Sequence, residues 1–91
     1  MKKVRKQILE AAIHHYGLGP QRDKAIEELS ELIRALARCD DHENIAEEMA
    51  DVRIMLDQLE LIFDNREQVR EFELAKLMRL SERLHLADTV G

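Results

Sequence analysis

The chain has 91 residues, of which 45% are hydrophobic and 36% are charged, and its net charge is −5 at pH 7. Its three Gly and one Pro suit a helical protein and argue against a β-sandwich or a disordered chain. The acidic balance counts against binding to duplex nucleic acid.

The short length predicts a single domain, residues 1–91, which would be marginally stable as a monomer because small domains bury too little surface. Cys39 is the only cysteine, so no internal disulfide can compensate. Oligomerisation is therefore expected. One cysteine also fits a reducing, cytoplasmic setting.

No targeting or membrane segment is expected. The opening residues are basic, but Gln7, Glu10, His14 and His15 interrupt the apolar run that a signal peptide needs. No stretch approaches the roughly 20 apolar residues of a membrane-spanning helix.

Two helices are expected in the first half of the chain. The first runs from about Lys3 to Tyr16 and ends at residues 17–19, which include two glycines. Pro20 suits the first turn of the second helix, which reaches about Arg38. Its apolar stripe recurs at steps of three and four and comprises Ile26, Leu29, Ile33 and Leu36.

Two further helices follow a polar loop over residues 39–43. Asn44, with Glu47 three residues later, resembles a capping box and predicts the start of the third helix. The third helix ends near residues 64–65, and its apolar positions are Ile45, Met49, Val52, Leu56, Leu59 and Phe63. The fourth runs from about Arg66 to Leu86, with Val69, Phe72, Leu77, Leu80 and Leu84 facing inward, and residues 87–91 are expected to fray.

Short connections favour antiparallel neighbours, so the expected fold is all-α, an up-and-down four-helix bundle that associates into oligomers. Tyr16 and Phe63 are expected in the core. His14 and His15 are expected at the surface or at an interface.

The candidate site consists of two carboxylate pairs, Glu28 with Glu31 and Glu48 with Asp51. Each pair is spaced i, i+3, which puts both members on one face of a helix. At about 100° per residue, Glu48 lies inside the apolar stripe of its own helix. Carboxylates that face each other on a buried seam repel, and a divalent cation relieves that repulsion. Mg²⁺ prefers such oxygen ligands.

The sequence Glu28-Leu-Ser-Glu31, a spacer, and then Glu48-Met-Ala-Asp51 resembles the ExxE…ExxD signature of the all-α NTP pyrophosphohydrolase superfamily. The flanking residues resemble the short, stand-alone MazG-like proteins of phages and prophages. The resemblance implies hydrolysis of an NTP or dNTP to the monophosphate and pyrophosphate. It also implies Mg²⁺, with Mn²⁺ as a substitute, held by Glu28, Glu31, Glu48 and Asp51 in a homodimer or homotetramer.

Other residues are candidates for catalysis and substrate binding. Either Glu31 or Glu27 is a candidate general base. Lys76, Arg79 and Arg83 lie within an arc of about 60° on the fourth helix and are candidates for a phosphate clamp, a family feature. Ordinary salt bridges on a solvated face remain the alternative for them. Gln21 is a weaker candidate for base recognition.

Three alternatives remain open. A di-iron bundle would need Glu-x-x-His on two helices, and only Glu82 with His85 fits that pattern. A non-catalytic helical oligomer or adaptor would keep the fold and a metal site. Phosphoribosyl-ATP pyrophosphohydrolase is a relative of similar size, but no flank resembles it more closely than the MazG-like set.

Overall fold

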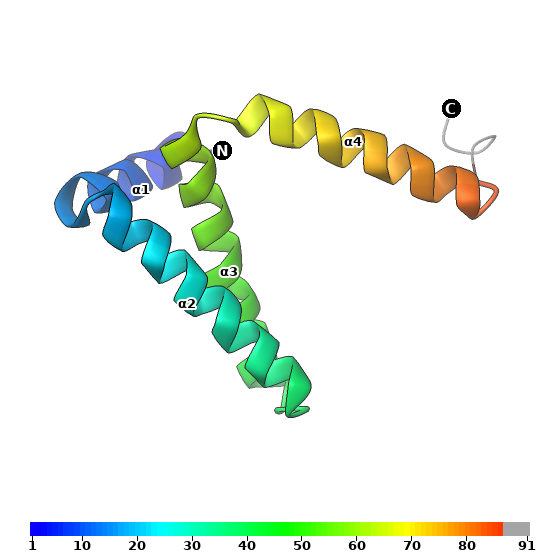
Figure 1. Ribbon diagram of the computed structural model, residues 1–91, viewed down its shortest axis with the longest axis horizontal. Coiled ribbons are helices and arrows are strands. Elements are labelled where there is room, and N and C mark those ends of the chain that lie inside the picture. The colour runs from blue at the N-terminus through cyan, green and yellow to red at the C-terminus, as the bar shows by residue number, and fades with distance from the viewer. Residues whose placement is uncertain (87–91) are drawn as a thin grey trace.

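The computed structural model describes residues 1–86, which form four α-helices joined by short turns (Figure 1). They are α1 (Lys3–Tyr16), α2 (Leu18–Ala37), α3 (His42–Phe63) and α4 (Arg66–Arg83). The expected all-α class and the four helices are confirmed. α2 begins two residues before Pro20, and α4 ends at Arg83 rather than Leu86. The expected frayed tail lies outside the described residues.

Local chemistry explains where the helices end. Gly17 ends α1 with a φ of 97°, and its N–H donates to the carbonyl oxygen of Ile13 at 2.8 Å. A positive φ favours glycine because it has no Cβ. Asp64 ends α3 in the left-handed conformation, which Asp tolerates better than most residues.

The predicted cap of α3 was wrong. Asp41, and not Asn44, is the N-cap, because its Oδ1 accepts a hydrogen bond from the backbone N–H of Asn44 at 2.8 Å. Asn44 lies inside the helix, and its side chain donates to Asp40 Oδ2 at 2.8 Å. The helix therefore begins at His42, one residue after an acidic cap that satisfies a free N–H.

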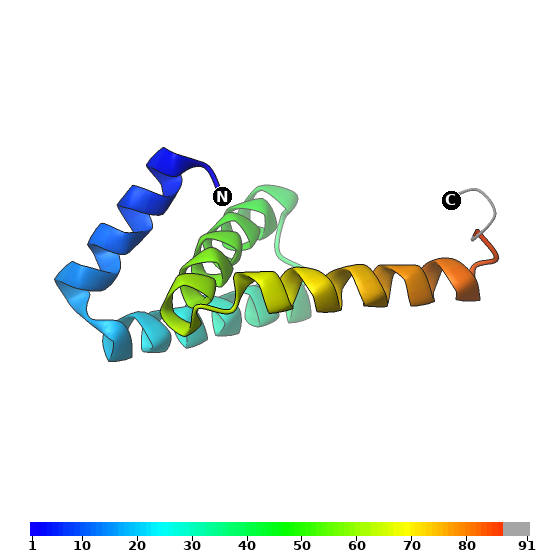
Figure 2. The same cartoon turned by 90° about the horizontal axis from the view of Figure 1, so that it is seen from above.

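α2 and α3 form an antiparallel hairpin, and α1 packs against both (Figures 1 and 2). Arg5 Nε on α1 lies 2.7 Å from Asp57 Oδ2 on α3. Nearby, Gln58 Nε2 donates to the carbonyl oxygen of Leu9 at 3.4 Å. These two contacts join α1 to the second half of α3.

Within one chain the helices do not close into the expected up-and-down bundle. Among the described residues α4 contacts only α3, and Figures 1 and 2 show it extending away from the other helices. The Cα radius of gyration is 16.2 Å, whereas a compact domain of this length has one of about 12 Å. The radius of gyration is larger than that of a compact domain because α4 does not pack against α1 or α2.

The core is small and differs from the predicted one. Its buried apolar residues are Leu9, Ala25, Ala35 and Val52. α2 turns its Ala25 and Ala35 face toward α3, because alanines let two helices approach closely, and this turns the predicted stripe of Ile26, Leu29, Ile33 and Leu36 outward. The apolar side chains of α4 are likewise exposed. Tyr16 and Phe63 are 60% and 55% exposed, so the prediction that they are core residues was wrong.

His14 and His15 are exposed, as expected for surface residues. No helix in residues 1–86 is both long enough and apolar enough to cross a membrane.

Candidate metal centre

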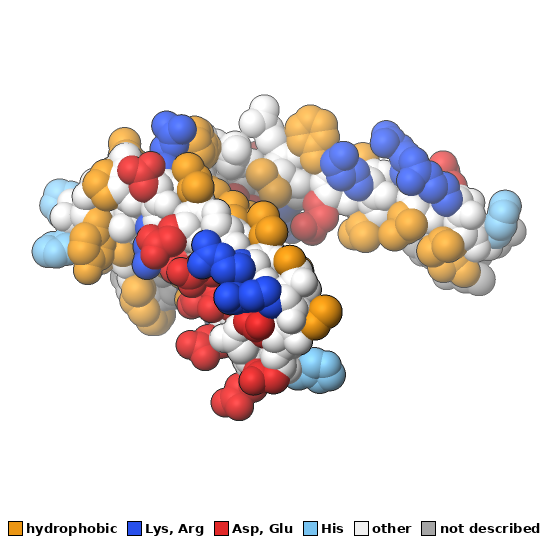
Figure 3. Space-filling view, turned by 60° about the horizontal axis from the view of Figure 1, so that its bottom comes forward, with side chains coloured by type: hydrophobic (Ala, Val, Ile, Leu, Met, Phe, Trp, Pro, Cys, Tyr) orange, Lys and Arg blue, Asp and Glu red, His pale blue; other side chains and the backbone are white. Residues whose placement is uncertain are grey.

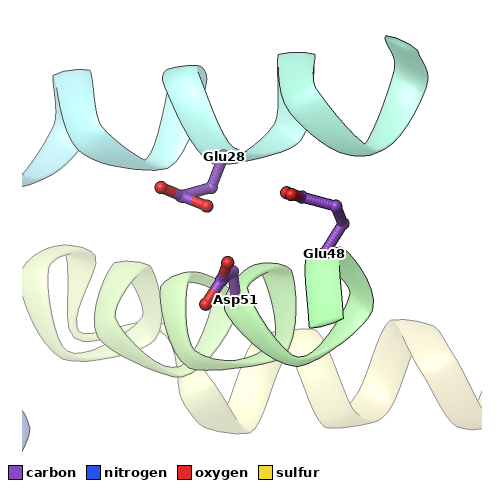
Figure 4. Close-up of side chains that lie close together, drawn as sticks. All are labelled: Glu28, Glu48 and Asp51. Atoms are coloured by element: carbon purple, nitrogen blue, oxygen red, sulfur yellow. The ribbon is translucent and has the colours of Figure 1, made fainter. Parts of the chain in front are cut away.

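Three carboxylates converge between α2 and α3. Glu28 projects from α2, and Glu48 and Asp51 project from α3 toward it (Figure 4). One oxygen from each side chain can be chosen so that all three lie within 4.8 Å of one another. The i, i+3 spacing puts Glu48 and Asp51 on one face of α3, and the antiparallel hairpin brings Glu28 opposite them.

Two oxygens in this cluster are enclosed and have no partner. Glu28 is only 7% exposed, and its Oε2 accepts no hydrogen bond. The Oε2 of Glu48 is in the same condition. A buried carboxylate oxygen without a donor is costly, and buried charges are normally paired or bound to metal. These two oxygens are therefore free to bind a cation.

Electrostatics make the cluster unfavourable on its own. Burial raises the pKa of Asp51, and the charge of Glu28 and a hydrogen-bonding interaction with the Glu28 side chain raise it further. Burial also raises the pKa of Glu48, with further contributions from the charges of Glu31 and Asp51. A bound cation would relieve the same repulsion among these carboxylates.

Lys24 is the one cation that contacts the cluster within the described residues. Its Nζ lies 3.2 Å from Glu28 Oε1 and 3.7 Å from Glu27 Oε1. The hydrogen bond to Glu28 is the largest cause of a raised Lys24 pKa. Sequence analysis did not select Lys24, although its i, i+4 spacing to Glu28 was a usable signal.

The other two carboxylates singled out in this helix have different positions. Glu31 is half-buried and is not among the three converging side chains, yet its charge raises the pKa of Glu48, so it borders the cluster. Glu27 is exposed and paired with Lys24. Of the four predicted ligands, the structure therefore brings three together, and Glu31 is not part of the convergent group.

The candidate phosphate clamp lies elsewhere in the chain. Lys76, Arg79 and Arg83 are exposed on α4, which extends away from the α2–α3 hairpin. Figure 3 shows basic side chains along α4, at a distance from the acidic side chains that gather over the hairpin together with some basic ones. A single chain does not bring the basic residues to the carboxylates.

Gln21, the candidate for base recognition, is buried in α2 and lies seven residues before Glu28. Seven residues are two helical turns, so Gln21 shares the inward face of α2 with the cluster. A side chain this enclosed is a packing residue in a single chain.

The di-iron pattern finds no support in residues 1–86. Glu82 and His85 are exposed there, and the one convergent group of potential ligands is Glu28, Glu48 and Asp51.

The donor set matches a hard divalent cation. Three carboxylates supply only oxygen ligands, and no His or Cys takes part. Mg²⁺ characteristically binds one or two carboxylates and retains several waters, and it also binds substrate phosphates, whereas Zn²⁺ favours His and Cys.

Comparisons of this chain with protein-family models, with curated proteins and with solved structures give no match.

Proposed function

We propose that this protein is a Mg²⁺-dependent nucleoside triphosphate pyrophosphohydrolase that cleaves an NTP or dNTP into the monophosphate and pyrophosphate. The observation that carries the proposal is the convergence of Glu28, Glu48 and Asp51, with two enclosed oxygens that have no partner. The resemblance to the MazG-like proteins supplies the reaction, and the acidic cluster supplies a place where the metal can act.

The residues divide into ligands and neighbours. Glu28, Glu48 and Asp51 would hold the cation, with Glu31 one turn beyond Glu28 as a fourth ligand. When bound, Mg²⁺ neutralises phosphate charge and lowers the pKa of a coordinated water. Phosphoryl transfer depends largely on such positioning and charge neutralisation.

A proton acceptor for the attacking water is also needed. Glu31 is the better placed of the two candidates, because it borders the cluster and is half-buried. Glu27 is exposed and already paired with Lys24. We therefore assign the general base to Glu31 when it is not itself coordinated, and leave Glu27 as a surface residue.

Phosphate binding by Lys76, Arg79 and Arg83 fits this proposal through a second copy of the chain. In one copy α4 carries these residues away from the cluster. A cytoplasmic homodimer or homotetramer would let the α4 of one subunit serve the carboxylates of another. The substrate is thus expected to bind between subunits.

The test is pyrophosphate release from a panel of NTPs and dNTPs, with Mg²⁺, with Mn²⁺ and with EDTA. Asp51→Asn should abolish release because it removes one converging ligand. Asp23→Asn is the matched control, since Asp23 is an exposed aspartate on α2 outside the cluster, and it should retain full activity.

The same assay separates the enzyme from its main alternative. A folded protein that binds Mg²⁺ but releases no pyrophosphate from any nucleotide would point to a non-catalytic oligomer that keeps a structural metal site. A protein that neither binds Mg²⁺ nor turns over nucleotide would contradict both readings.

A further inference from the structure

The α2–α3 hairpin carries a broad apolar surface that is exposed to solvent in the part of the chain that the structure describes. We call it the hairpin face; it comprises Ile26, Leu29, Ile33 and Leu36 of α2 with Met49, Leu56 and Phe63 of α3. Each of these side chains is at least 37% exposed. Exposed apolar residues that stand singly are normal, but a contiguous set this large marks an interaction surface.

Helical geometry puts the two halves of the hairpin face on one side. Each residue advances about 100° around its helix axis. Counted in the same sense from Glu28, the α2 residues of the hairpin face lie roughly 80–160° around the axis of α2. Counted from Glu48, the α3 residues lie roughly 60–100° around the axis of α3. Glu28 and Glu48 point toward each other across the seam (Figure 4). Because the helices are antiparallel, an equal rotation on each leads to the same side of the hairpin. The two halves therefore adjoin.

A second exposed apolar surface, which we call the arm stripe, comprises Val69, Leu77 and Leu80 of α4 and Leu84 directly after its end. These four residues lie within an arc of about 80°, and Figure 3 shows apolar side chains along α4. α4 has 18 residues, and among the four described helices it contacts only α3. An isolated helix of that length is marginal in water, because helices in proteins depend on packing of an apolar face.

The total exposed area indicates how much surface must be covered. The chain exposes 7498 Å². A compact monomer of 10.6 kDa exposes about 5,500 Å². The excess of about 2,000 Å² per chain, or about 4,000 Å² for two, falls within the range that obligate homodimers bury.

We propose that α4 is an exchanged arm: in a homodimer, the arm stripe of each copy packs on the hairpin face of the other. The occupant is a second copy because two uncovered apolar surfaces of matching length occur on one chain. α4 spans about 27 Å and residues 18–37 of α2 span about 30 Å, at 1.5 Å per residue. This inference stands independently of the proposed enzymatic function.

A two-fold reciprocal exchange covers both surfaces with one type of contact. If two hairpin faces instead packed directly on each other, the arm stripes would remain in water. If α4 folded back onto its own hairpin, the turn at residues 64–65 would have to reverse direction. Reciprocal exchange keeps the observed turn and satisfies the closed symmetry typical of homo-oligomers.

Sedimentation velocity of the full chain tests the dimer. The mass obtained for the wild type should be that of two chains. Leu77→Glu on the arm stripe and Ile33→Glu on the hairpin face should each shift it to single chains. Gln68→Glu is the matched control, because Gln68 lies on α4 roughly opposite the arm stripe and is exposed, and it should leave the dimer intact.

Cross-linking tests the exchange itself and does not depend on the glutamate variants folding. In a Cys39→Ser background, differently tagged Leu77→Cys and Ile33→Cys chains are co-expressed and treated with a short bismaleimide. The expected product joins the two tagged chains, with a yield several-fold above that from Gln68→Cys paired with Ile33→Cys. A wild type that sediments as single chains would overturn the proposal, and so would a Leu77→Cys yield no higher than the Gln68→Cys yield.

Discussion

Replacing Asp51 with Asn should stabilise the protein in EDTA and destabilise it, relative to the wild type, in Mg²⁺. The substitution keeps the size of the side chain but removes its negative charge. Without metal, that charge lies among those of Glu28 and Glu48 and is repelled by them. With metal, the same charge is one of the attractions that hold the cation, so the sign of the effect reverses.

The magnitude follows from the separation of the carboxylates. Two unit charges at the 4.8 Å limit found here repel by about 0.9 kcal/mol in water and by about 3.5 kcal/mol at a dielectric constant of about 20. Asp51 is only half-buried, so solvent screens the pair and the lower value applies. We expect a gain of about 1 kcal/mol in EDTA, which raises the melting temperature of a domain this size by about 4–8 °C.

The pH dependence has a definite sign. The pKa values of Asp51 and Glu48 are raised in the folded chain, so above the ordinary carboxylate pKa the folded state retains protons that the unfolded state has lost. The free energy of unfolding then decreases as the pH rises through the raised pKa values. For these two groups the metal-free protein is therefore more stable near pH 5 than near pH 7. In Asp51→Asn, the free energy of unfolding should decrease less between about pH 5 and about pH 7 than it does in the wild type.

Thermal unfolding followed by circular dichroism measures these effects, at one fixed protein concentration because association contributes to stability. The wild type, Asp51→Asn and the control Asp23→Asn are compared in EDTA and in Mg²⁺, near pH 5 and near pH 7. Saturation to about 100 times the dissociation constant should stabilise the wild type by about 2.7 kcal/mol. The reasoning is refuted if Asp51→Asn lowers the melting temperature in EDTA, or if Mg²⁺ shifts the wild type and the variant equally.

Three other substitutions probe the surroundings. Lys24→Gln removes the cation beside Glu28, so the protein should be less stable in EDTA but not at saturating Mg²⁺; equal losses in both would show that Lys24 acts independently of the cluster. Asp41→Ala removes the cap of α3 and should cost about 1 kcal/mol in urea unfolding, and a loss under about 0.3 kcal/mol would argue against the cap. Gln58 is 2% exposed; its Oε1 has no hydrogen-bond partner, and its Nε2 makes only a long hydrogen bond to Leu9. Gln58→Leu should therefore leave the free energy of unfolding unchanged or raise it by about 1 kcal/mol. A marked loss of stability would reveal a partner for Oε1.

Much of the local structure was predictable because it depends on neighbours in the chain. The bounds of α1 were predicted correctly, since Gly17 stops the helix where the apolar period ends. The i, i+3 spacing also made the facing of Glu48 and Asp51 predictable. Their convergence with Glu28 required only a short antiparallel hairpin, which the polar loop predicted over residues 39–43 allowed, although α3 already begins at His42.

The orientation of α2 was not predictable from periodicity. The helix has two stripes with helical spacing, one of large aliphatic residues that includes Ile33, and one that includes Ala25, Glu28 and Ala35. A hydrophobic pattern favours the first, but close packing against α3 selects the small residues of the second. The aliphatic stripe was therefore predicted as core and is exposed.

The course of α4 was also beyond sequence reasoning. Amphipathicity shows that a helix needs a partner, but it does not say whether the partner belongs to the same chain. The short turn at Asp64 and Asn65 was compatible with an antiparallel return, yet α4 extends away. The direction of α4 decides which carboxylates its basic residues can reach. The phosphate clamp of Lys76, Arg79 and Arg83 therefore remains a prediction.

The most direct test of the proposed reaction is phosphorus NMR of a dNTP incubated with the 91-residue chain and Mg²⁺. We predict equal amounts of monophosphate and pyrophosphate, with no diphosphate intermediate, and no turnover in EDTA or with Asp51→Asn. Absence of turnover by the folded, Mg²⁺-bound wild type for every NTP and dNTP tried would contradict the proposal. Release of diphosphate and inorganic phosphate, or an undiminished rate with Asp51→Asn, would contradict it equally.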